Sequence, residues 1–290
     1  MNASTDTSTP TFGALAPGLV DRLVMALTKP LPETYAGLRL AILLRRAVTM
    51  RLAYPDGALD VERWGMRMRL HPRDNGCEKN LLFTPRMYEP EELAHLEIDI
   101  AQVKAEGRAF TFVDIGANVG LFSLFVASCA GQHGRILAIE PEPGNLRRLE
   151  FNVRANPDAP IKIIPNALGD EPGFVAVELD RRDRGGTRTK KIGQAGAPAG
   201  TVRVPSLPLL ALLTSEGVDT VDALKIDVEG LEDVILCPFF RDAPAQLWPR
   251  LIIAEDSRPS WKADLMAVMQ AKGYRLVALS RHNNLILRRS

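Results

Sequence analysis

The chain has 290 residues, of which 46% are hydrophobic and 24% are charged, and its formal net charge is +1. This composition is typical of a globular protein, and no apolar run reaches the ~18–20 residues that span a bilayer. The small net charge excludes the broad basic surface on which nucleic-acid binding depends. The three cysteines lie far apart and no two histidines have metal-ligand spacing, so we expect free thiols and no zinc site.

The first 106 residues carry no motif that assigns a function. Residues 1–13 are rich in Ser and Thr and lack the pattern of a secretory signal, so we expect a disordered lead-in and a cytoplasmic protein. Residues 14–106 are expected to form an N-terminal α/β cap segment, with helices over Leu38–Leu52 and Pro90–Glu106 and a strand around Trp64–Leu70. This cap either helps to select the substrate, or only covers the core or makes a homodimer contact.

The helix predicted over Leu38–Leu52 combines aliphatic residues with four arginines. A basic amphipathic helix can lie on an anionic membrane. We nevertheless expect no membrane contact.

From residue 107 to residue 290, short aliphatic strands alternate with helices, a pattern typical of a mostly parallel sheet covered on both faces. The last two strands are joined by too few residues for a crossover helix, so they are expected to form an antiparallel hairpin. We predict one doubly wound α/β domain. The strands are expected at 111–115, 135–139, 161–164, 223–227, 250–255, 275–279 and 284–288, and the helices are expected to open near Gly120, Asn145, Ser206 and Ser260.

A glycine loop follows the first of these strands, with the sequence Asp114-Ile115-Gly116-Ala117-Asn118-Val119-Gly120. Glycines let the chain turn sharply and let a ligand approach the backbone closely. A dinucleotide loop would have glycine in place of Asn118, so pyrophosphate binding is disfavoured. Asp114 at the mouth of the loop suits a positively charged ligand without phosphate. The alternative is a tight strand-to-helix turn with a capping Asp or Asn.

Glu140 ends the second strand, where a carboxylate can accept hydrogen bonds from ribose hydroxyls. Alone it could equally be a solvated charge, but together with the glycine loop it favours a cofactor site. Asn145 either contacts this cofactor or caps the next helix. Asn166 and Ala167 follow the third strand, where an adenine ring would lie, unless they form a plain turn.

Asp227 and Glu229 stand two residues apart at the end of the fourth strand. In an extended chain both side chains point to one side, so we expect both to face the crevice at the carboxyl ends of the strands. Carboxylates there can align an acceptor and take up its proton. We expect Asp227 at the reaction centre and Glu229 as base or cation ligand. The reverse order, or Glu229 as a helix cap, is the alternative.

The blocks FVDIGANVGLFS, AIEPEPGN, NALGD, GGT and ALKIDVEGLEDVIL, in this order, resemble the FkbM family of S-adenosylmethionine-dependent methyltransferases. The resemblance covers about Tyr88 to the C-terminus and implies a Rossmann-like class I methyltransferase fold, with a seven-stranded sheet and S-adenosylmethionine as cofactor. Members of known function mostly methylate oxygen on sugars or macrolide-like natural products, so we expect O-methylation of a small-molecule or glycan acceptor. By resemblance the methionine end lies among Asp114, Gly116, Asn118 and Gly120, the ribose at Glu140, the adenine near Asn166, and the transferred methyl group near Asp227 and Glu229.

Three further residues are candidates for acceptor binding. Glu255 ends the fifth strand, Thr187 stands where the family often has Ser, and His282 lies in the hairpin turn, where a plain surface role is the alternative. Thr187 belongs to the basic segment Arg181–Lys191, which is either a solvated loop or a clamp for an anionic acceptor. No metal site is predicted, although Mg²⁺ on the Asp227–Glu229 pair is an alternative.

Two other functions fit part of the pattern. A nicotinamide-dependent oxidoreductase could share the general fold, but Asn118 argues against it. A non-catalytic adenosylmethionine-binding module is the second, and the acidic pair at 227 and 229 argues against that.

Overall fold

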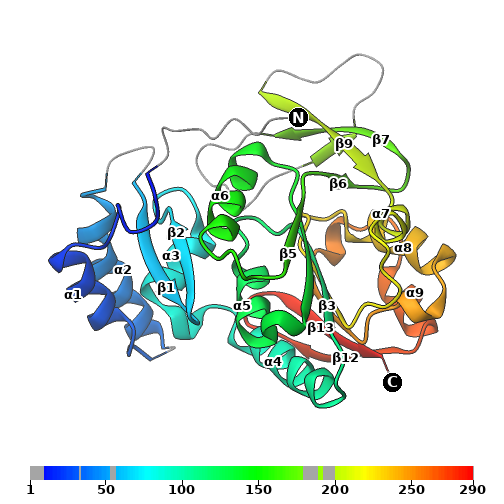
Figure 1. The fold of residues 1–290 in the computed structure, drawn as a ribbon, viewed down its shortest axis with the longest axis horizontal. Helices are drawn as coiled ribbons and strands as arrows, with labels where there is room; N and C mark the ends of the chain where they lie inside the picture. The colour runs from blue at the N-terminus through cyan, green and yellow to red at the C-terminus, as the bar shows by residue number, and fades with distance from the viewer. Residues whose placement is uncertain (1–9, 33, 53–56, 179–188, 192–199, 290) are drawn as a thin grey trace. The chain divides into compact units, whose positions relative to one another are not determined.

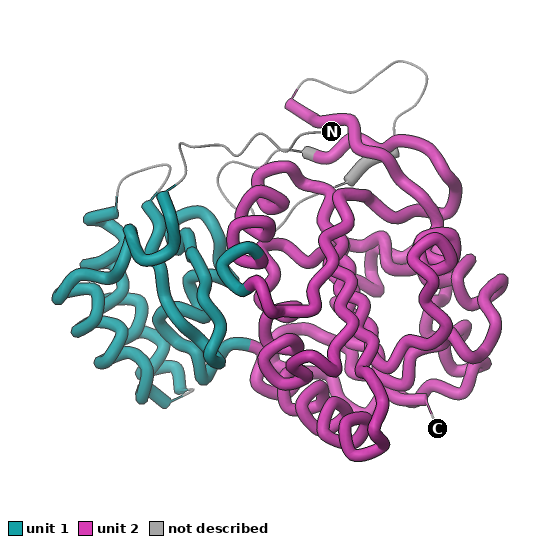
Figure 2. Tube along the Cα trace, viewed as in Figure 1, with its two compact units in different colours: residues 1–88, 154–156 teal, residues 89–153, 157–290 magenta. Residues whose placement is uncertain are grey.

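The computed structural model describes residues 10–32, 34–52, 57–178, 189–191 and 200–289. The chain forms two compact units (Figure 2). Unit 1 comprises Met1–Tyr88 with Arg154–Asn156, and unit 2 comprises Glu89–Val153 with Pro157–Ser290. The second unit therefore begins at Glu89 rather than at residue 107, because the helix that follows packs its apolar residues against the second unit.

Unit 1 contains a two-stranded antiparallel hairpin and helices (Figure 1). The strand expected around Trp64–Leu70 begins two residues late, because Trp64 and Gly65 both have positive φ and form the hairpin turn. The elements are α1 (Leu19–Thr28), α2 (Tyr35–Thr49), β1 (Leu59–Arg63), β2 (Met66–Leu70), α3 (Gly76–Phe83) and the 3-10 turn η1 (Pro85–Met87).

A buried ion pair joins the two strands of unit 1. The side chains of Arg69 and Asp60 are 7% and 1% exposed, and two hydrogen bonds of 2.7 and 2.9 Å join them. Asp60 also accepts from the backbone N–H groups of Gly13 and Leu15, and Arg69 donates to two carbonyl groups of residues 10–11. Residues 10–13, which we expected in the disordered lead-in, are therefore bound to the hairpin.

A short segment from later in the chain completes unit 1. The side-chain amide of Asn156 donates to the carbonyl of Arg67 and accepts from its N–H, at 2.7 and 2.9 Å. One asparagine thus satisfies the backbone groups of a strand residue, as a neighbouring strand would.

The seven-stranded sheet of unit 2 confirms the predicted fold class. Its order is β12-β13-β11-β10-β3-β4-β5, and β13 runs antiparallel to both of its neighbours while the other pairs are parallel. The predicted terminal hairpin is present. The strands are β3 (Phe110–Ile115), β4 (Gly134–Ile139), β5 (Ile161–Ile164), β10 (Ala223–Ile226), β11 (Leu251–Glu255), β12 (Tyr274–Leu279) and β13 (Asn284–Arg289).

Helices cover the sheet of unit 2, and two of them begin later than predicted. Ser206 lies in a strand, and the helix begins after Pro208. Ser260 lies in a 3-10 turn, and Asp264 is the true cap, accepting from the N–H of Ala267. The helices are α4 (Pro90–Ala105), α5 (Leu121–Ala130), α6 (Pro143–Arg154), α7 (Leu209–Ser215), α8 (Glu232–Asp242) and α9 (Leu265–Ala271), with 3-10 turns η2 (Gly131–His133), η3 (Ala245–Leu247) and η4 (Arg258–Ser260).

A second, four-stranded sheet with the order β6-β9-β7-β8 was not predicted. Its strands are β6 (Ala167–Leu168), β7 (Gly173–Glu178), β8 (Thr189–Lys191) and β9 (Thr201–Leu207). They are short or half-exposed and lack the continuous aliphatic character of the central strands.

The strand order of the large sheet reverses between β3 and β10. The chain steps outward from β3 through β4 to β5 on one side, and from β10 outward on the other. Parallel sheets bind ligands at the carboxyl ends of the strands beside such a switch point. The glycine loop and the acidic pair follow these two strands.

The ion pair of unit 1 predicts a large stability effect. Asp60→Ala leaves the Arg69 guanidinium buried without its carboxylate, which costs about 3–5 kcal/mol. On the same strand, Glu62 makes an exposed ion pair 3.7 Å from Arg67, and Glu62→Ala should cost less than about 1 kcal/mol. Urea unfolding of both variants measures the difference, and equal losses would contradict it.

Candidate active site

The glycine loop is held against the ends of two strands. Gly116 has φ +75°, and a Cβ there would lie 2.1 Å from the carbonyl oxygen of Asp227, so no side chain fits. The N–H groups of Gly116 and Ala117 both donate to the carbonyl of Ile139 at 3.0 Å. Asn118 and Gly120 also have positive φ, which makes the loop a tight turn before α5.

Glu140 is buried at the end of β4 and binds the glycine loop directly. Its carboxylate accepts from the N–H of Asn118 at 2.7 Å and from the N–H of Glu142 at 2.9 Å. Burial raises the pKa of Glu140 to about 8, and these two N–H groups oppose the rise. The structure thus brings together two of the predicted cofactor residues.

Asp114 is fully buried, next to α5 rather than at the mouth of the loop. One carboxyl oxygen accepts from the hydroxyl of Ser123 at 2.6 Å, and the other, Oδ1, has no hydrogen-bond partner among the described residues. Burial raises the pKa of Asp114, and the positive charge of Lys225 opposes the rise. A buried carboxyl oxygen without a partner favours a nearby cation.

Three further predicted cofactor residues lie outside the glycine loop. Asn145 lies inside α6, and Glu142 caps that helix by accepting from the Asn145 N–H, so the capping role expected for Asn145 belongs to Glu142. Asn166 follows β5, and its N–H donates to the carbonyl of Ile164 at 2.9 Å. Ala167 begins β6 and packs in the core of the small sheet.

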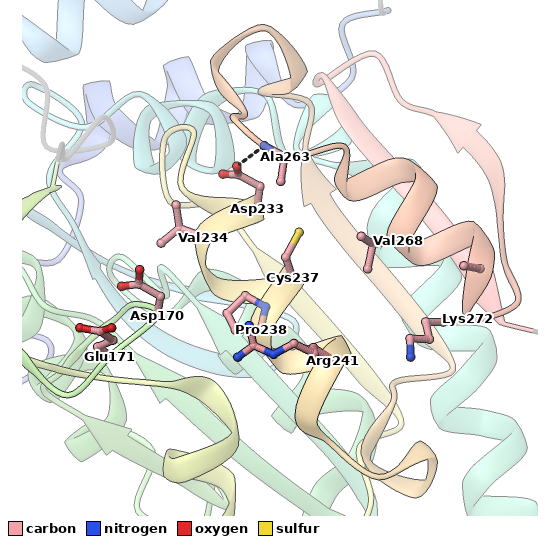
Figure 3. A pocket seen from close by; sticks show the side chains of 11 residues that line it. Asp170, Glu171, Asp233, Val234, Cys237, Pro238, Arg241, Ala263, Val268 and Lys272 are labelled. Carbon is pink, nitrogen blue, oxygen red and sulfur yellow. Dashed lines mark hydrogen bonds between the residues drawn. The ribbon is translucent and has the colours of Figure 1, made fainter.

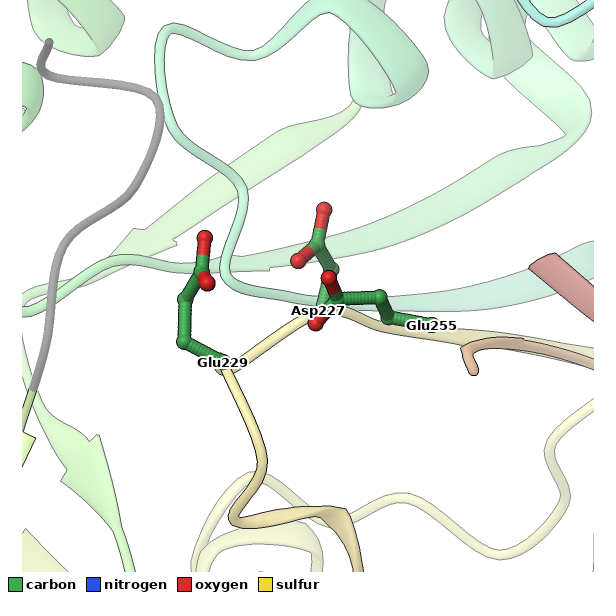
Figure 4. A group of neighbouring side chains, drawn as sticks. All are labelled: Asp227, Glu229 and Glu255. Carbon is green, nitrogen blue, oxygen red and sulfur yellow. The ribbon is translucent and has the colours of Figure 1, made fainter. Parts of the chain in front are cut away.

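Three carboxylates converge at the ends of β10 and β11 (Figure 4). One carboxyl oxygen from each of Asp227, Glu229 and Glu255 lies within 4.8 Å of the others. The structure confirms that the side chains of Asp227 and Glu229 lie close together. The chain between them is not extended, as we had expected it to be. The strand ends at Ile226, and Glu229 has φ +56°, so a turn brings the side chains together.

Glu232 holds that turn from the first residue of α8. Its Oε1 accepts from the N–H groups of Val228 and Gly230 at 3.1 and 3.3 Å, and its Oε2 accepts from the indole of Trp261 at 2.7 Å. Glu229 was considered as a cap of this helix. Instead, the side chain of Glu232, which lies within the helix, binds the turn. Glu229 is left exposed beside its neighbours.

Lys225 is a site residue that the sequence analysis missed. Its Nζ lies 3.1 Å from Asp227 Oδ2 and 3.4 Å from the carbonyl oxygen of Gly116, and it faces the Phe122 ring at 5.4 Å. A lysine in an aliphatic strand is usually taken as a solvated charge at the edge of the sheet. The sequence pattern alone does not distinguish a buried lysine from a solvated one. Lys225 supplies the acidic cluster with a positive charge through its contact with Asp227.

A second acidic group lies on α4 and was also missed. The amide of Asn284 donates to Glu89 Oε2 and to Glu92 Oε1, both at 2.8 Å. Burial and the charge of Glu92 raise the pKa of Glu89 to about 9, while Lys225 lowers it and Asp227 raises it further. Acidic residues at the start of a helix are usually explained by their interaction with the helix dipole. The sequence therefore offers no reason to single out Glu89 and Glu92.

Two candidate acceptor residues are not part of the cluster as described. Thr187, with residues 181–188 of the basic segment, lies outside the described residues. His282 is exposed in the turn between β12 and β13, where its N–H donates to the Ser280 hydroxyl at 3.2 Å. Glu255 does join the cluster. Burial and the charge of Asp227 raise its pKa.

A separate cavity of about 670 Å³ lies between α8 and α9 (Figure 3). Cys237, Arg241 and Lys272 are among its lining residues, and Asp233 at its rim accepts from the N–H of Ala263 at 2.9 Å. None of the predicted site residues that the structure describes lines it. In the described part of the chain, no helix is long and apolar enough to cross a membrane.

The strand order, the terminal antiparallel hairpin and the glycine loop without a phosphate fingerprint define a Rossmann-like class I methyltransferase. The chain belongs to the methyltransferase FkbM domain family, which it matches over residues 114–276, more than half of its length. Membership implies S-adenosylmethionine as the methyl donor. A cationic ligand of this kind fits the partnerless Asp114 oxygen, the buried Glu140 and the acidic cluster.

Solved structures with detectable similarity include several methyltransferases. The METTL16 methyltransferase domain is 17% identical, with 93% of this chain and 80% of that chain covered and a TM-score of 0.47. A human methyltransferase 10 domain containing protein is 16% identical (93% and 96% covered, TM-score 0.44). Precorrin-6y C5,15-methyltransferase from Geobacter metallireducens is 15% identical (68% and 85% covered, TM-score 0.38). Similarity this distant says nothing of the acceptor, and no curated protein matches the chain.

The raised pKa of Glu89 predicts a pH-dependent stability. An unfolded Glu titrates near its usual 4.5 and the folded Glu89 near 9, so the folded state holds a proton that the unfolded state releases between these values. This contribution is complete below the lower value and is lost as the pH rises through the higher one. Glu89→Gln keeps an uncharged group of the same shape, so its melting temperature should fall less than the wild type's between pH 5 and 9. If the melting temperatures of the two proteins fell equally between pH 5 and 9, Glu89 would be ionised in the folded protein.

Proposed function

We propose that the protein transfers the methyl group of S-adenosylmethionine to a hydroxyl group of a sugar or natural-product acceptor. The observation that carries the proposal is the convergence of Asp227, Glu229 and Glu255 at the ends of β10 and β11. The glycine loop touches the first of them, since Gly116 approaches the Asp227 carbonyl too closely for a Cβ. Proton-accepting groups therefore adjoin the loop expected to hold the methyl donor.

The cofactor contacts are proposed for the loop and the strand ends around it. The turn at Gly116, Asn118 and Gly120 would receive the methionine end, and Glu140 would accept hydrogen bonds from the ribose. Asn166 and Ala167 are proposed for the adenine end, and Asn145 for a further contact with the cofactor. Asp114 is proposed to act from below the loop, where the cationic groups of the donor would favour its ionised form against the effect of burial.

When bound, S-adenosylmethionine would supply the methyl group, and the electron pair of its carbon–sulfur bond would stay on sulfur as the acceptor oxygen bonds to the methyl carbon. Glu229 is proposed to accept the hydrogen bond of the reacting hydroxyl, while Asp227 fixes the acceptor at the reaction centre. The hydroxyl proton then passes to Glu229, the exposed member of the cluster, and from there to solvent. A carboxylate is a far weaker base than an alkoxide, so this proton leaves as the new bond forms.

Glu255 is proposed to bind a second hydroxyl of the acceptor. Burial and the charge of Asp227 raise its pKa, which makes it easier to protonate than an exposed glutamate. Lys225 keeps Asp227 in place through its 3.1 Å contact. No metal ion takes part in this proposal, and EDTA is expected to leave the rate unchanged.

The first test is cofactor choice. Thermal shift with S-adenosylmethionine, S-adenosylhomocysteine and NADH should show stabilisation by the first two only. Stabilisation by NADH alone would favour the nicotinamide-dependent oxidoreductase. Methyl transfer from labelled donor to a panel of hydroxylated sugars and macrolides tests the acceptor class, and binding without turnover would favour a non-catalytic module.

Glu140→Gln should weaken S-adenosylhomocysteine binding. Because burial raises the pKa of Glu140 to about 8, its carboxyl group is largely uncharged at neutral pH, and losing an uncharged hydrogen-bond partner costs about 0.5–1.5 kcal/mol, which is roughly 2- to 12-fold in affinity. Isothermal titration calorimetry measures it. Asp158→Asn removes an exposed charge just before β5 and should leave the affinity unchanged. Wild-type affinity in Glu140→Gln would remove this residue from the cofactor site.

Asp227→Asn should abolish methyl transfer and leave S-adenosylhomocysteine binding within about twofold, because Asp227 is proposed to position the acceptor and not the cofactor. Asp219→Asn, an exposed change in the loop before β10, is the matched control and should keep full activity. Steady-state rates and calorimetry on the same preparations separate the two effects. Full activity of Asp227→Asn would rule this residue out of the reaction.

A further inference from the structure

The helix α1 exposes a continuous apolar stripe. Leu19, Leu23 and Leu27 are 85%, 59% and 49% exposed, and residues four apart lie on one face of a helix. The opposite side, with Val24 and Thr28, is buried. The helix therefore covers the interior of its unit with one face and presents leucines on the other.

The neighbouring helix α2 exposes apolar and basic side chains together. Tyr35 and Leu43 are 72% and 63% exposed, and Arg39 and Arg46 lie on the same face at helical spacing. The opposite face, with Gly37, Ala41 and Val48, is buried. Arg39 stacks on the Tyr35 ring at 5.0 Å, so its charge is held beside an exposed aromatic group.

Single exposed apolar side chains are common on protein surfaces, but a cluster of them is not. Among the described residues, fourteen large hydrophobic side chains are exposed, and nine of them lie between Leu19 and Met50. The two helices also pack against each other. This concentration marks the α1–α2 hairpin, residues 18–52, as a binding surface.

The charge of the α1–α2 hairpin selects its partner. Residues 18–52 contain six Arg and Lys against two Asp and Glu, in a chain whose net charge is only +1. The helix α2 contains three arginines and no acidic residue. A twofold dimer through this face would bring like charges together, because each copy presents the same surface. An anionic surface with an apolar interior matches both properties.

We propose that the α1–α2 hairpin docks the protein on an anionic lipid bilayer, with its leucines in the boundary between headgroups and acyl chains. The two helices have 10 and 15 residues, too short to span, so they would lie in the membrane plane. The sequence alone led us to expect no membrane contact, because only α2 was considered and the exposure of α1 was unknown. This inference does not rest on the proposed methyl transfer.

Co-sedimentation with vesicles tests the proposal. The full chain should bind vesicles of phosphatidylcholine with one third phosphatidylserine, bind phosphatidylcholine alone weakly, and lose binding as salt is raised. Replacing Leu23 and Leu27 with Ser should weaken binding by about tenfold for each leucine, the equivalent of its burial in the bilayer. Arg39→Gln with Arg46→Gln should remove the preference for anionic vesicles.

Matched controls use exposed apolar residues outside the hairpin. Ile98→Ser and Leu279→Ser, 61% and 52% exposed in the wild type, should bind vesicles as the wild type does. Melting temperatures check that every variant folds. Absence of wild-type binding to anionic vesicles would overturn the proposal. So would a dimer, seen by light scattering, that dissociates in the leucine variants, because it would assign the hairpin to a second copy of the chain.

Discussion

The site depends on the close approach of one glycine to the neighbouring strand end. Gly116 lies so near the Asp227 carbonyl that a Cβ would stand 2.1 Å from its oxygen. The N–H of Gly116 bonds to Ile139 of β4, and its carbonyl lies 3.4 Å from the Lys225 ammonium of β10. One residue without a side chain thus joins the ends of three strands, and the positions of the loop and of the acidic turn are set together.

Charge is distributed unevenly around that junction. Lys225 contacts Asp227 and acts electrostatically on Asp114, Glu255 and Glu89, so carboxyl groups outnumber the cation that they share. Burial makes several of these carboxyl groups harder to ionise. A donor that arrives with a sulfonium and an ammonium group offsets this excess of negative charge, whereas a pyrophosphate would add to it.

The sequence predicted the central sheet well, because its strands are short, aliphatic and separated by clear helices. It also predicted which residues stand at the strand ends, since the carboxyl ends of parallel strands meet at one edge. It missed the small sheet, Lys225 and the Glu89–Glu92 pair. A buried charge or a half-exposed strand is defined by what packs on it from elsewhere in the chain, and neither has a periodic signature. The turn at Glu229 was missed because a positive φ there is imposed by Glu232 rather than by a glycine.

The amide of Asn156, which binds both backbone groups of Arg67, belongs to the first unit although β3, β4 and α6 intervene. During synthesis the chain emerges from its N-terminus, so residues 10–88 leave the ribosome well before this asparagine does. The first unit can therefore reach its final hydrogen bonding only after the opening strands of the second have been made. Its maturation on the ribosome is tied to translation of the methyltransferase core, and a fragment cut at the boundary would lack its last closing contact.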